Sequence, residues 1–262
     1  MLRSAKSTIL NLIKKTGWEF VKSSVINEIL HGLPLDSSPA HLETYDKVKS
    51  FTMTTPQRVI SFCNAVDYIE KNNIPGAIVT CGVWRGGIPM AAIDTLNKFN
   101  NQSRDIHLYD TFEGMTTVPS EFDVKALGHT GSGQSAADLY RNADVNNPVF
   151  CYSSLDEAKK NLGKMDYPAD KVHYIKGFVE DTIPQTKPDK IALLYLNVCF
   201  YKPVLHALNH LYPLLEPGAV LFIGDYGGWE GTKKAVDEFI VNNKIKLLLN
   251  RIDEAGRIGV KV

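Results

Sequence analysis

Apolar positions along the chain follow two alternating patterns. Short apolar runs bounded by Gly, Pro or Asp are typical of buried strands, and they occur at 76–84, 105–110, 172–177, 191–197 and 219–225. Elsewhere apolar residues recur every three or four positions, which predicts helices at 54–73, 89–100, 155–165, 203–215 and 231–243. Strands that alternate with helices predict an α/β fold with a mostly parallel, doubly wound sheet.

Two segments do not follow this alternation. Residues 1–50 carry apolar positions at roughly helical spacing and the loop "HGLPLDSSP", so we predict a helical N-terminal extension that also acts as a lid. The main domain is then 51–262. Within it, residues 116–148 are rich in Gly, Ser, Thr, Asn and Asp, which predicts a substrate lid loop with a short helix near 136–141.

Composition narrows the class of partner. The 262 residues include 29 acidic and 29 basic side chains, so nothing favours broad capture of nucleic acid or an anionic membrane. A small neutral or mixed-charge substrate fits better. No segment approaches about 18 consecutive apolar residues, which argues against a membrane span. The four cysteines are far apart and form no CxxC motif, so we expect a reducing, cytoplasmic location without disulfides or structural zinc.

The segment "TCGVWRGG", Thr80 to Gly87, follows a predicted strand directly and precedes a predicted helix. Gly82, Gly86 and Gly87 would let a bound cofactor approach the backbone closely, and the helix start offers free N–H groups. The spacing is not the dinucleotide-binding GxGxxG. A plain tight turn is therefore the alternative interpretation of these glycines.

Asp110 ends the next predicted strand, in "HLYDTFEGM". A carboxylate at this place can accept hydrogen bonds from both hydroxyls of a ribose. The alternative is an aspartate that caps the loop, because Asp is common after strands. Together with the glycine loop, Asp110 favours a nucleoside-containing cofactor.

Several segments together resemble the macrocin O-methyltransferase (TylF/MycF) family of S-adenosylmethionine (SAM)-dependent enzymes. They are "IPGAIVTCGVWRGG", "LYDTFEGM", "VEDTIP", "HLYPLLEPGAVLFIGDYGGW" and "KKAVDEF", and the similarity runs from about Tyr45 to Phe239. The resemblance implies a Rossmann-like class I methyltransferase fold, O-methylation of a sugar or natural product, and Mg²⁺. It also implies these cofactor-binding residues: Met53, Thr54, Thr80, Gly82, Val83, Trp84, Arg85, Gly86, Gly87, Asp110, Thr111, Phe112, Gly177, Phe178 and Asp181.

The chain departs from this family where the resemblance places the metal. The family's "LDGDWYEST" reads "LNVCFYKPV" and its "IDDYG" reads "IGDYG", so Asn197 and Gly224 replace two of three aspartates and Asp225 remains. Mg²⁺ needs oxygen ligands and usually carboxylate charge. We therefore predict no metal at this site. Thr80 also replaces a family glutamate, which predicts weaker SAM binding.

The candidate catalytic residues are Asp225, Asn197, Lys202 and His129. Methyl transfer needs an aligned acceptor and removal of the acceptor's proton. Asp225 is the carboxylate left at the strand end and is the favoured base or anchor. Lys202 either anchors substrate oxygens in place of the metal or is solvated at a helix start. His129 in the lid segment is the nearest substitute for a family lid histidine, and a solvated loop histidine is the alternative.

The remaining histidines are expected to be structural. His206 and His210 are four residues apart on one helix face, and such pairs can bind metal, but no third ligand is near in the sequence. His107 and His173 fall inside predicted strands and are expected in the core or the next layer.

The sequence thus predicts a metal-independent methyltransferase that binds SAM and a small-molecule acceptor, with neither nucleic acid nor membrane as partner. It leaves the oligomeric state open, a homo-oligomer included. One alternative is a SAM-binding partner or scaffold protein that transfers no methyl group. Another is a metal-independent SAM enzyme with a different reaction, such as N-methylation or a rearrangement. The missing carboxylates favour these alternatives.

Overall fold

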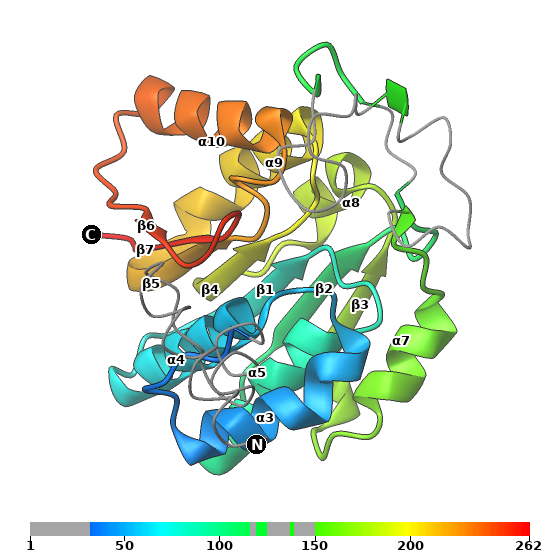
Figure 1. Ribbon diagram of the computed structural model, residues 1–262, viewed down its shortest axis with the longest axis vertical. Coiled ribbons are helices and arrows are strands. Elements are labelled where there is room, and N and C mark those ends of the chain that lie inside the picture. Colours follow the sequence, from blue (N-terminus) through cyan, green and yellow to red (C-terminus); the bar gives the residue numbers. More distant parts are fainter. Residues whose placement is uncertain (1–31, 116–118, 125–136, 139–149) are drawn as a thin grey trace, which may run out of the picture. The chain divides into compact units, whose positions relative to one another are not determined.

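The computed structural model describes residues 32–115, 119–124, 137–138 and 150–262 (Figure 1). The chain separates into two compact units, Met1–Leu35 and Asp36–Val262, and all elements below belong to the second. Most of the predicted N-terminal extension and most of the predicted lid loop lie outside the described residues, and of the predicted short helix only residues 137–138 are described, as helical. No helix in the described part of the chain is long and apolar enough to cross a membrane.

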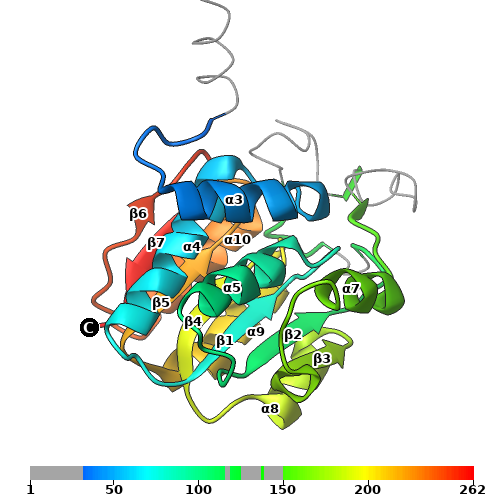
Figure 2. The ribbon, with the colours of Figure 1, turned by 90° about the horizontal axis from the view of Figure 1, so that it is seen from below.

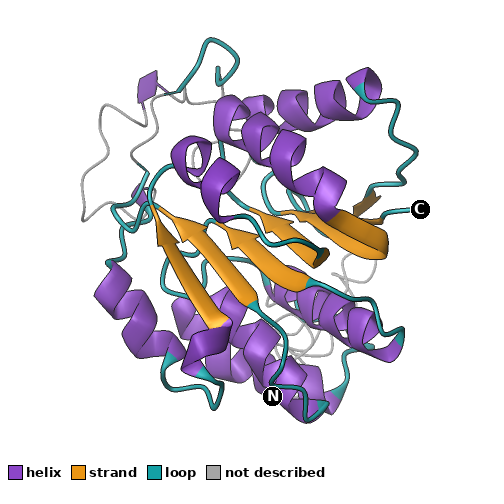
Figure 3. Cartoon of the chain, turned by 180° about the vertical axis from the view of Figure 1, so that it is seen from behind, coloured by secondary structure: helices purple, strands orange, loops and turns teal. Residues whose placement is uncertain are grey.

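A seven-stranded mixed sheet forms the centre of the larger unit (Figure 3). In spatial order its strands are β3 (Val172–Lys176), β2 (Ile106–Asp110), β1 (Ala77–Cys81), β4 (Ile191–Leu196), β5 (Leu215–Ile223), β7 (Arg257–Val260) and β6 (Asn250–Arg251). The first five are parallel, and they confirm the predicted α/β sheet. β7 and β6 add an antiparallel edge that the apolar pattern did not predict.

Helices cover both faces of the sheet (Figure 1). One layer contains α3 (Pro39–Val48), α4 (Pro56–Lys71), α5 (Gly87–Lys98) and α7 (Leu155–Leu162). The other contains α8 (Val179–Thr186), α9 (Tyr201–Leu211) and α10 (Glu230–Asn242). Single turns of 3-10 helix lie at Lys49–Phe51 (η1), Ala169–Lys171 (η3) and Tyr212–Leu214 (η4). This doubly wound arrangement places the carboxyl ends of the five parallel strands at one edge of the sheet.

Helix α3 lies within the predicted extension 1–50 but belongs to the larger unit. It packs across the outer side of α4 and α5 (Figure 2). Thr44 and Val48 are fully buried there. The Thr44 hydroxyl donates to the Asp94 carboxylate at 2.7 Å, and Lys47 forms an ion pair with the same carboxylate at 2.7 Å. Residues 36–50 are therefore part of the support of α5.

The central strands are buried on both faces because both faces carry helices. Every residue of β1 and β4 is buried, which explains their continuous apolar runs. On the α4 side, Phe62 meets Tyr195 and Phe222 edge to face, with ring centroids 5.6 and 5.9 Å apart. The strand ends that carry polar side chains are thus mounted on a rigid core.

Residues 119–124, a described part of the predicted lid loop, are anchored to α9. Asp123 is 3% exposed, and its carboxylate accepts hydrogen bonds from the backbone N–H groups of Tyr201 at 2.9 Å and Ser120 at 2.8 Å. The ring of Phe122 lies 4.5 Å from that of Tyr201. This described part of the predicted lid loop is therefore packed against α9.

Candidate functional site

Gly82 allows the carboxyl ends of three strands to meet. Its φ is +86°, and a Cβ at this position would lie 2.2 Å from the carbonyl oxygen of Asn197 at the end of β4. Its N–H donates to the carbonyl of Tyr109 in β2 at 2.9 Å. Any side chain at position 82 would push β4 away from β1, so this glycine is required by the protein's own packing.

Gly86 and Gly87 are also enclosed by protein atoms. A Cβ at Gly86 would lie 2.3 Å from a methyl carbon of Leu162, and one at Gly87 would lie 2.6 Å from the Phe51 carbonyl oxygen. These glycines bring α7 and η1 close to the start of α5. The tight turn considered from the sequence is present, and α5 begins directly after it at Gly87, which is buried. At both glycines, the space that a Cβ would need is occupied by other atoms of the protein.

Asp110, at the end of β2, fixes the shape of the glycine loop. One carboxylate oxygen accepts the N–H groups of Val83 and Trp84 at 2.6 and 3.0 Å. The other accepts the N–H of Phe112 at 2.7 Å. The oxygen that accepts the Phe112 N–H has a second lone pair, so Asp110 can accept a ligand hydroxyl while it keeps the loop in place. The capping role and the ribose-binding role considered from the sequence are therefore compatible.

Several residues implied for the cofactor offer only their backbone. The side chains of Val83 and Phe112 are in the core, with 5% and 2% exposure. Trp84 and Phe112 have positive φ of 49° and 53°, which is uncommon for residues with a side chain and often marks functional loops. The Thr111 hydroxyl donates to the Gly114 carbonyl at 3.0 Å. This loop therefore presents a fixed backbone surface.

Three large side chains are exposed near these strand ends. Met53, Tyr152 and Phe178 are 51%, 45% and 40% exposed. Tyr152 adjoins the glycine loop, since its carbonyl accepts the indole N–H of Trp84 at 3.1 Å. Phe178 follows Gly177, whose N–H donates to the Asp110 carbonyl at 3.0 Å. Exposed apolar side chains around convergent polar groups are typical of a ligand site, and they fit an adenosyl group.

The remaining residues implied for the cofactor are placed as follows. Arg85 forms an ion pair with Glu157 of α7 at 2.6 Å and donates to the Ser50 carbonyl at 3.1 Å. It therefore connects α7 to the segment before α4. Thr54 is half-buried, and Asp181 is exposed in the first turn of α8. The hydroxyl of Thr80 is buried and has no hydrogen-bond partner among the described residues.

Asn197 and Gly224 end two neighbouring strands and touch each other. The Asn197 N–H donates to the Cys81 carbonyl at 2.8 Å, and the Gly224 N–H donates to the Leu196 carbonyl at 2.7 Å. A Cβ at Gly224 would lie 2.0 Å from Asn197 Oδ1. That oxygen is buried and has no donor in the described part of the chain. The Asn197 amide thus fills the space that a side chain at 224 would need.

Asp225 lies beside a buried arginine that the sequence analysis did not single out. The Arg58 side chain, 10% exposed, donates from Nη1 to the Gly224 carbonyl at 2.9 Å and lies 3.7 Å from Asp225 Oδ1. The Cys199 thiol donates to Asp225 Oδ2 at 3.4 Å. Burial raises the pKa of Asp225, and the Arg58 charge opposes that increase. Asp225 is thus a half-buried carboxylate with a fixed cation as neighbour.

Arg58 is held in turn by the turn between β6 and β7. Its Nε donates to Asp253 Oδ2 at 2.7 Å, and the hydroxyl of Thr55 donates to the same oxygen. Asp253 also accepts the N–H of Gly256 at 2.6 Å. The cap of α4, the cation and the C-terminal turn therefore form one network next to Asp225. Sequence spacing gives no signal for it, because Arg58 and Asp253 are 195 positions apart.

The residues at these strand ends do not fit Mg²⁺. Asp225 is the single carboxylate of the three positions, and the guanidinium of Arg58 lies 3.7 Å from it. Asn197 supplies one neutral oxygen, and Gly224 supplies no side chain. Within the described residues, no group of three or more His, Cys, Asp or Glu side chains is arranged to hold a metal ion. The donor set therefore falls short of the carboxylate-rich octahedral site that Mg²⁺ requires.

The other catalytic candidates and the remaining histidines are placed as follows. Lys202 is exposed in the first turn of α9, as in the solvated interpretation. His129 lies outside the described residues. The side chains of His206 and His210 stack on each other with centroids 4.1 Å apart. His107 lies opposite His173 on β3, and burial lowers the pKa of His107 to about 4.

A family model described as macrocin O-methyltransferase (TylF) matches residues 41–258, a range that contains all the strand-end residues described above. The chain belongs to this family. The macrocin O-methyltransferase family assignment confirms the resemblance seen in the sequence. It makes the protein a SAM-dependent methyltransferase with a Rossmann-like class I fold.

Relatives and solved structures agree with this membership. Demethyldecarbamoylnovobiocin O-methyltransferase of Streptomyces niveus is 29% identical over 78% of this chain and 73% of its own. Mycinamicin III 3''-O-methyltransferase of Micromonospora griseorubida is 25% identical over 94% of this chain and 93% of its own. The structure of the O-methyltransferase NovP aligns with a TM-score of 0.68 and 28% identity, and it covers 81% of this chain and 82% of that one.

Proposed function

We propose that this family member transfers the methyl group of SAM to a hydroxyl of a small molecule, such as a sugar or another natural product, without a metal ion. The observation that carries the proposal is the convergence of Asp110 and Asp225 at one edge of the sheet. Relatives whose names specify O-methylation of novobiocin and mycinamicin precursors support the acceptor class.

The described residues divide into a donor side and an acceptor side. On the donor side, Asp110 would accept the ribose hydroxyls, and the backbone of Gly82 to Gly86 would line the methionine end of SAM. Met53 and Phe178 would cover the adenosyl group, because they are exposed and apolar. On the acceptor side, Asn197 Oδ1 has no donor among the described residues, and Asp225 follows the end of the neighbouring strand.

When bound, SAM supplies a methyl group on a positively charged sulfur. The acceptor oxygen forms a bond to that carbon as the carbon–sulfur bond breaks, and its hydroxyl proton must leave. We assign the proton to Asp225, whose carboxylate is held by Arg58 and Cys199. Asn197 Oδ1 would accept a hydrogen bond from a second acceptor hydroxyl. The protein's contribution is alignment and charge balance.

The absence of a metal requirement is part of the proposal and is supported by the donor set. The positive charge beside Asp225 comes from Arg58, a covalently attached cation with a side-chain exposure of 10%. This arrangement leaves Asp225 available as a base or anchor. The exposed position of Lys202 makes Arg58 the better candidate for the cation of this site.

Calorimetric titration with S-adenosylhomocysteine (SAH), the demethylated product, tests the donor side. Incubation with SAM and a panel of glycosides and other small alcohols, followed by SAH release and mass detection of the methylated product, tests the transfer. We expect SAH binding and turnover of at least one hydroxyl acceptor. Binding of SAH without turnover of any hydroxyl compound, but with turnover of amines, would contradict O-methylation. No binding of SAH or SAM would contradict the proposal altogether.

A further inference from the structure

Two arginines face each other across the β6–β7 hairpin. Arg251 and Arg257 are direct partners in the antiparallel register. Like charges placed directly opposite on neighbouring strands destabilise a hairpin. In the described residues, neither guanidinium forms an ion pair with a carboxylate, whereas Arg58 nearby pairs with Asp253. The arginine pair therefore carries an excess of two positive charges at this edge.

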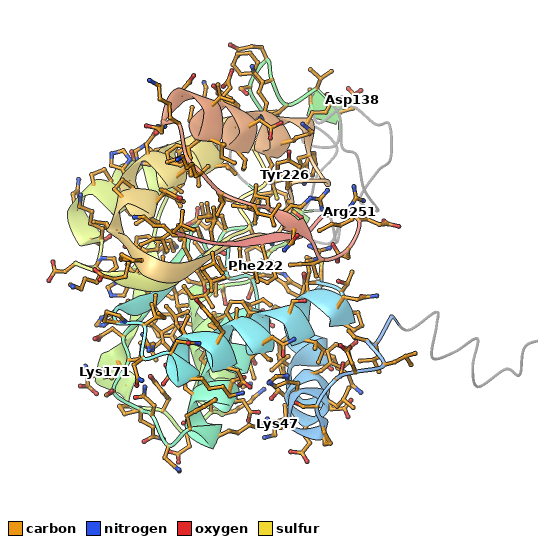
Figure 4. All side chains as sticks on the ribbon, turned by 90° about the vertical axis from the view of Figure 1, so that its left-hand side faces the viewer. Lys47, Asp138, Lys171, Phe222, Tyr226 and Arg251 are labelled. Carbon is orange, nitrogen blue, oxygen red and sulfur yellow. The ribbon has the colours of Figure 1, made fainter. Side chains whose placement is uncertain are left out.

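The arginine pair lies beside the proposed transfer site. Arg257 is also the partner of Ile223, the last residue of β5, and Gly224 and Asp225 follow directly. The guanidinium carbon of Arg257 is 5.0 Å from the ring centroid of Tyr226. Figure 4 shows Arg251 and Tyr226 at the same end of the hairpin. An acceptor that reaches Asp225 can therefore also reach this edge of the sheet.

Arg257 is held in a fixed orientation but is not neutralised. It is 8% exposed, and its Nη1 donates to the carbonyl oxygens of Gly256 at 2.8 Å and Asp253 at 3.4 Å. No acceptor for its Nε or Nη2 is found among the described residues. Burial lowers the pKa of Arg257, and the charge of Arg251 lowers it further. A guanidinium remains charged despite such shifts, so the charge needs an external partner.

Two carboxylates near Tyr226 and Arg257 are already engaged by other groups. Asp237 accepts the Tyr226 hydroxyl at 2.6 Å and forms an ion pair with Lys233. Asp253 is bound by Arg58, Thr55 and the turn amides. A dianionic group with several oxygens is what two neighbouring guanidinium groups bind best, because each offers a planar fork of donors.

We infer that Arg251 and Arg257 form a binding site for a phosphate group carried by the methyl acceptor. The inference rests on the proposed function and narrows it to phosphorylated small molecules. The phosphate would lie on the β6–β7 side of Asp225, away from the SAM side of the site. Tyr226, between Asp225 and the arginine pair, would contact the part of the acceptor that joins the phosphate to the reacting hydroxyl.

The test is a titration of the SAH-saturated protein with pyrophosphate and inorganic phosphate, with acetate as a monoanionic comparison. We expect the wild type to bind pyrophosphate at millimolar concentration and acetate at least tenfold more weakly. Arg257→Met and Arg251→Met should each weaken pyrophosphate binding by roughly ten- to a hundredfold, the usual effect of losing charge-assisted hydrogen bonds. Lys261→Met is the matched control. Lys261 follows β7 at its other end and lies 5.2 Å from the Tyr212 ring, so its loss changes net charge equally and should alter binding less than twofold.

SAH affinity and thermal denaturation, measured on the same samples, show that each variant is folded. If Arg257→Met does not fold, Arg251→Met decides the matter, because Arg251 is exposed. Lack of pyrophosphate binding by a protein that binds SAH would overturn the phosphate site and leave the proposed function intact. Equal binding of acetate and pyrophosphate, or equal effects of Arg251→Met and Lys261→Met, would also overturn it.

Discussion

Asp110 uses both carboxylate oxygens to hold backbone N–H groups of the loops that follow β1 and β2. The same carboxylate is the group that would bind a ribose. A substitution at this residue therefore changes the ligand contact and the loop geometry together. Asp110 was identifiable from the sequence because it directly follows an apolar run, but its three backbone partners were not.

Asp110→Ala should weaken SAH binding. Loss of charge-assisted hydrogen bonds to the ribose costs about 1.5–3 kcal/mol, which is roughly ten- to a hundredfold in affinity. Calorimetric titration of wild type and variant measures it. Asp110→Asn, which keeps the shape of the side chain, is the control for loop geometry and should weaken binding less. Unchanged SAH affinity in Asp110→Ala would rule out the ribose contact.

Asp225→Asn should lower the rate of methyl transfer by about a hundredfold or more, because an amide cannot take the acceptor's proton. SAH affinity should stay within about twofold of the wild type, since Asp225 lies on the acceptor side. Single-turnover measurements with a confirmed acceptor separate the two effects. An unchanged rate would show that the proton leaves by another route.

At the scale of elements, the cap of α4 and the β6–β7 turn are joined through one guanidinium. Arg58 and Asp253 are both buried, with side-chain exposures of 10% and 9%. A buried ion pair that loses one partner leaves an uncompensated charge. Neither β6 nor β7 could be predicted, because strands of two and four residues with charged positions show no clear alternation.

Arg58→Met should lower the free energy of unfolding by about 3–5 kcal/mol, because Asp225 and Asp253 lose their common cation. Arg104→Met is the matched control. Arg104 is equally buried and pairs with Glu70 at 2.6 Å, at the opposite ends of the strands. Chemical denaturation should show that both variants are destabilised. Of the two variants, only Arg58→Met should also reduce the rate of methyl transfer. An equal loss of that rate in Arg104→Met would contradict a role of Arg58 at the site.

Because of the residues at the ends of β4 and β5, we expect that removal of metal ions by a chelator leaves methyl transfer unchanged. Two family carboxylates are absent there, and the guanidinium of Arg58 occupies the position 3.7 Å from Asp225. Activity with and without EDTA, together with metal analysis of the purified protein, measures this. Activity abolished by EDTA and rescued by Mg²⁺ would contradict it. A Cβ at position 224 would lie 2.0 Å from Asn197 Oδ1, and Asn197→Asp keeps the same side-chain shape, so Gly224→Asp requires the side chain at 197 to move.

At the scale of the whole molecule, Asp253 contributes to stability in a defined pH range. Burial raises its pKa, but hydrogen bonds from Thr55 and Gly256 and the charge of Arg58 outweigh this, so the pKa lies below its ordinary value of 3.8. A lowered carboxyl pKa stabilises the fold above that value, and the stabilisation is lost as the pH falls through the folded pKa. We therefore expect the free energy of unfolding, measured by denaturation at several acidic pH values, to decrease less steeply with falling pH in Asp253→Asn than in the wild type. Identical slopes would contradict this contribution.

The sequence predicted the parts of the molecule whose signal is local. Five strands show as apolar runs, and apolar residues recur at helical spacing through α4, so the sheet and α4 could be placed. Helix α8 escaped prediction because it is short and contains Pro184. The Arg58–Asp253 pair and the Arg251–Arg257 pair arise from contacts between distant segments or from a hairpin register. No spacing in a single sequence encodes such contacts.

The long separation between Arg58 and Asp253 has a consequence for synthesis on the ribosome. Domains fold as their chains emerge, beginning with the N-terminal parts. Helix α4 and the first strands are available early, but the partner that fixes Arg58 is translated 195 residues later. Until then the Arg58 guanidinium next to Asp225 lacks the Asp253 carboxylate that holds it in place. The nascent polypeptide therefore acquires its reactive geometry only in the final stage of translation, and intermediates that lack the turn at Asp253 would be inactive and open to surveillance by chaperones and proteases.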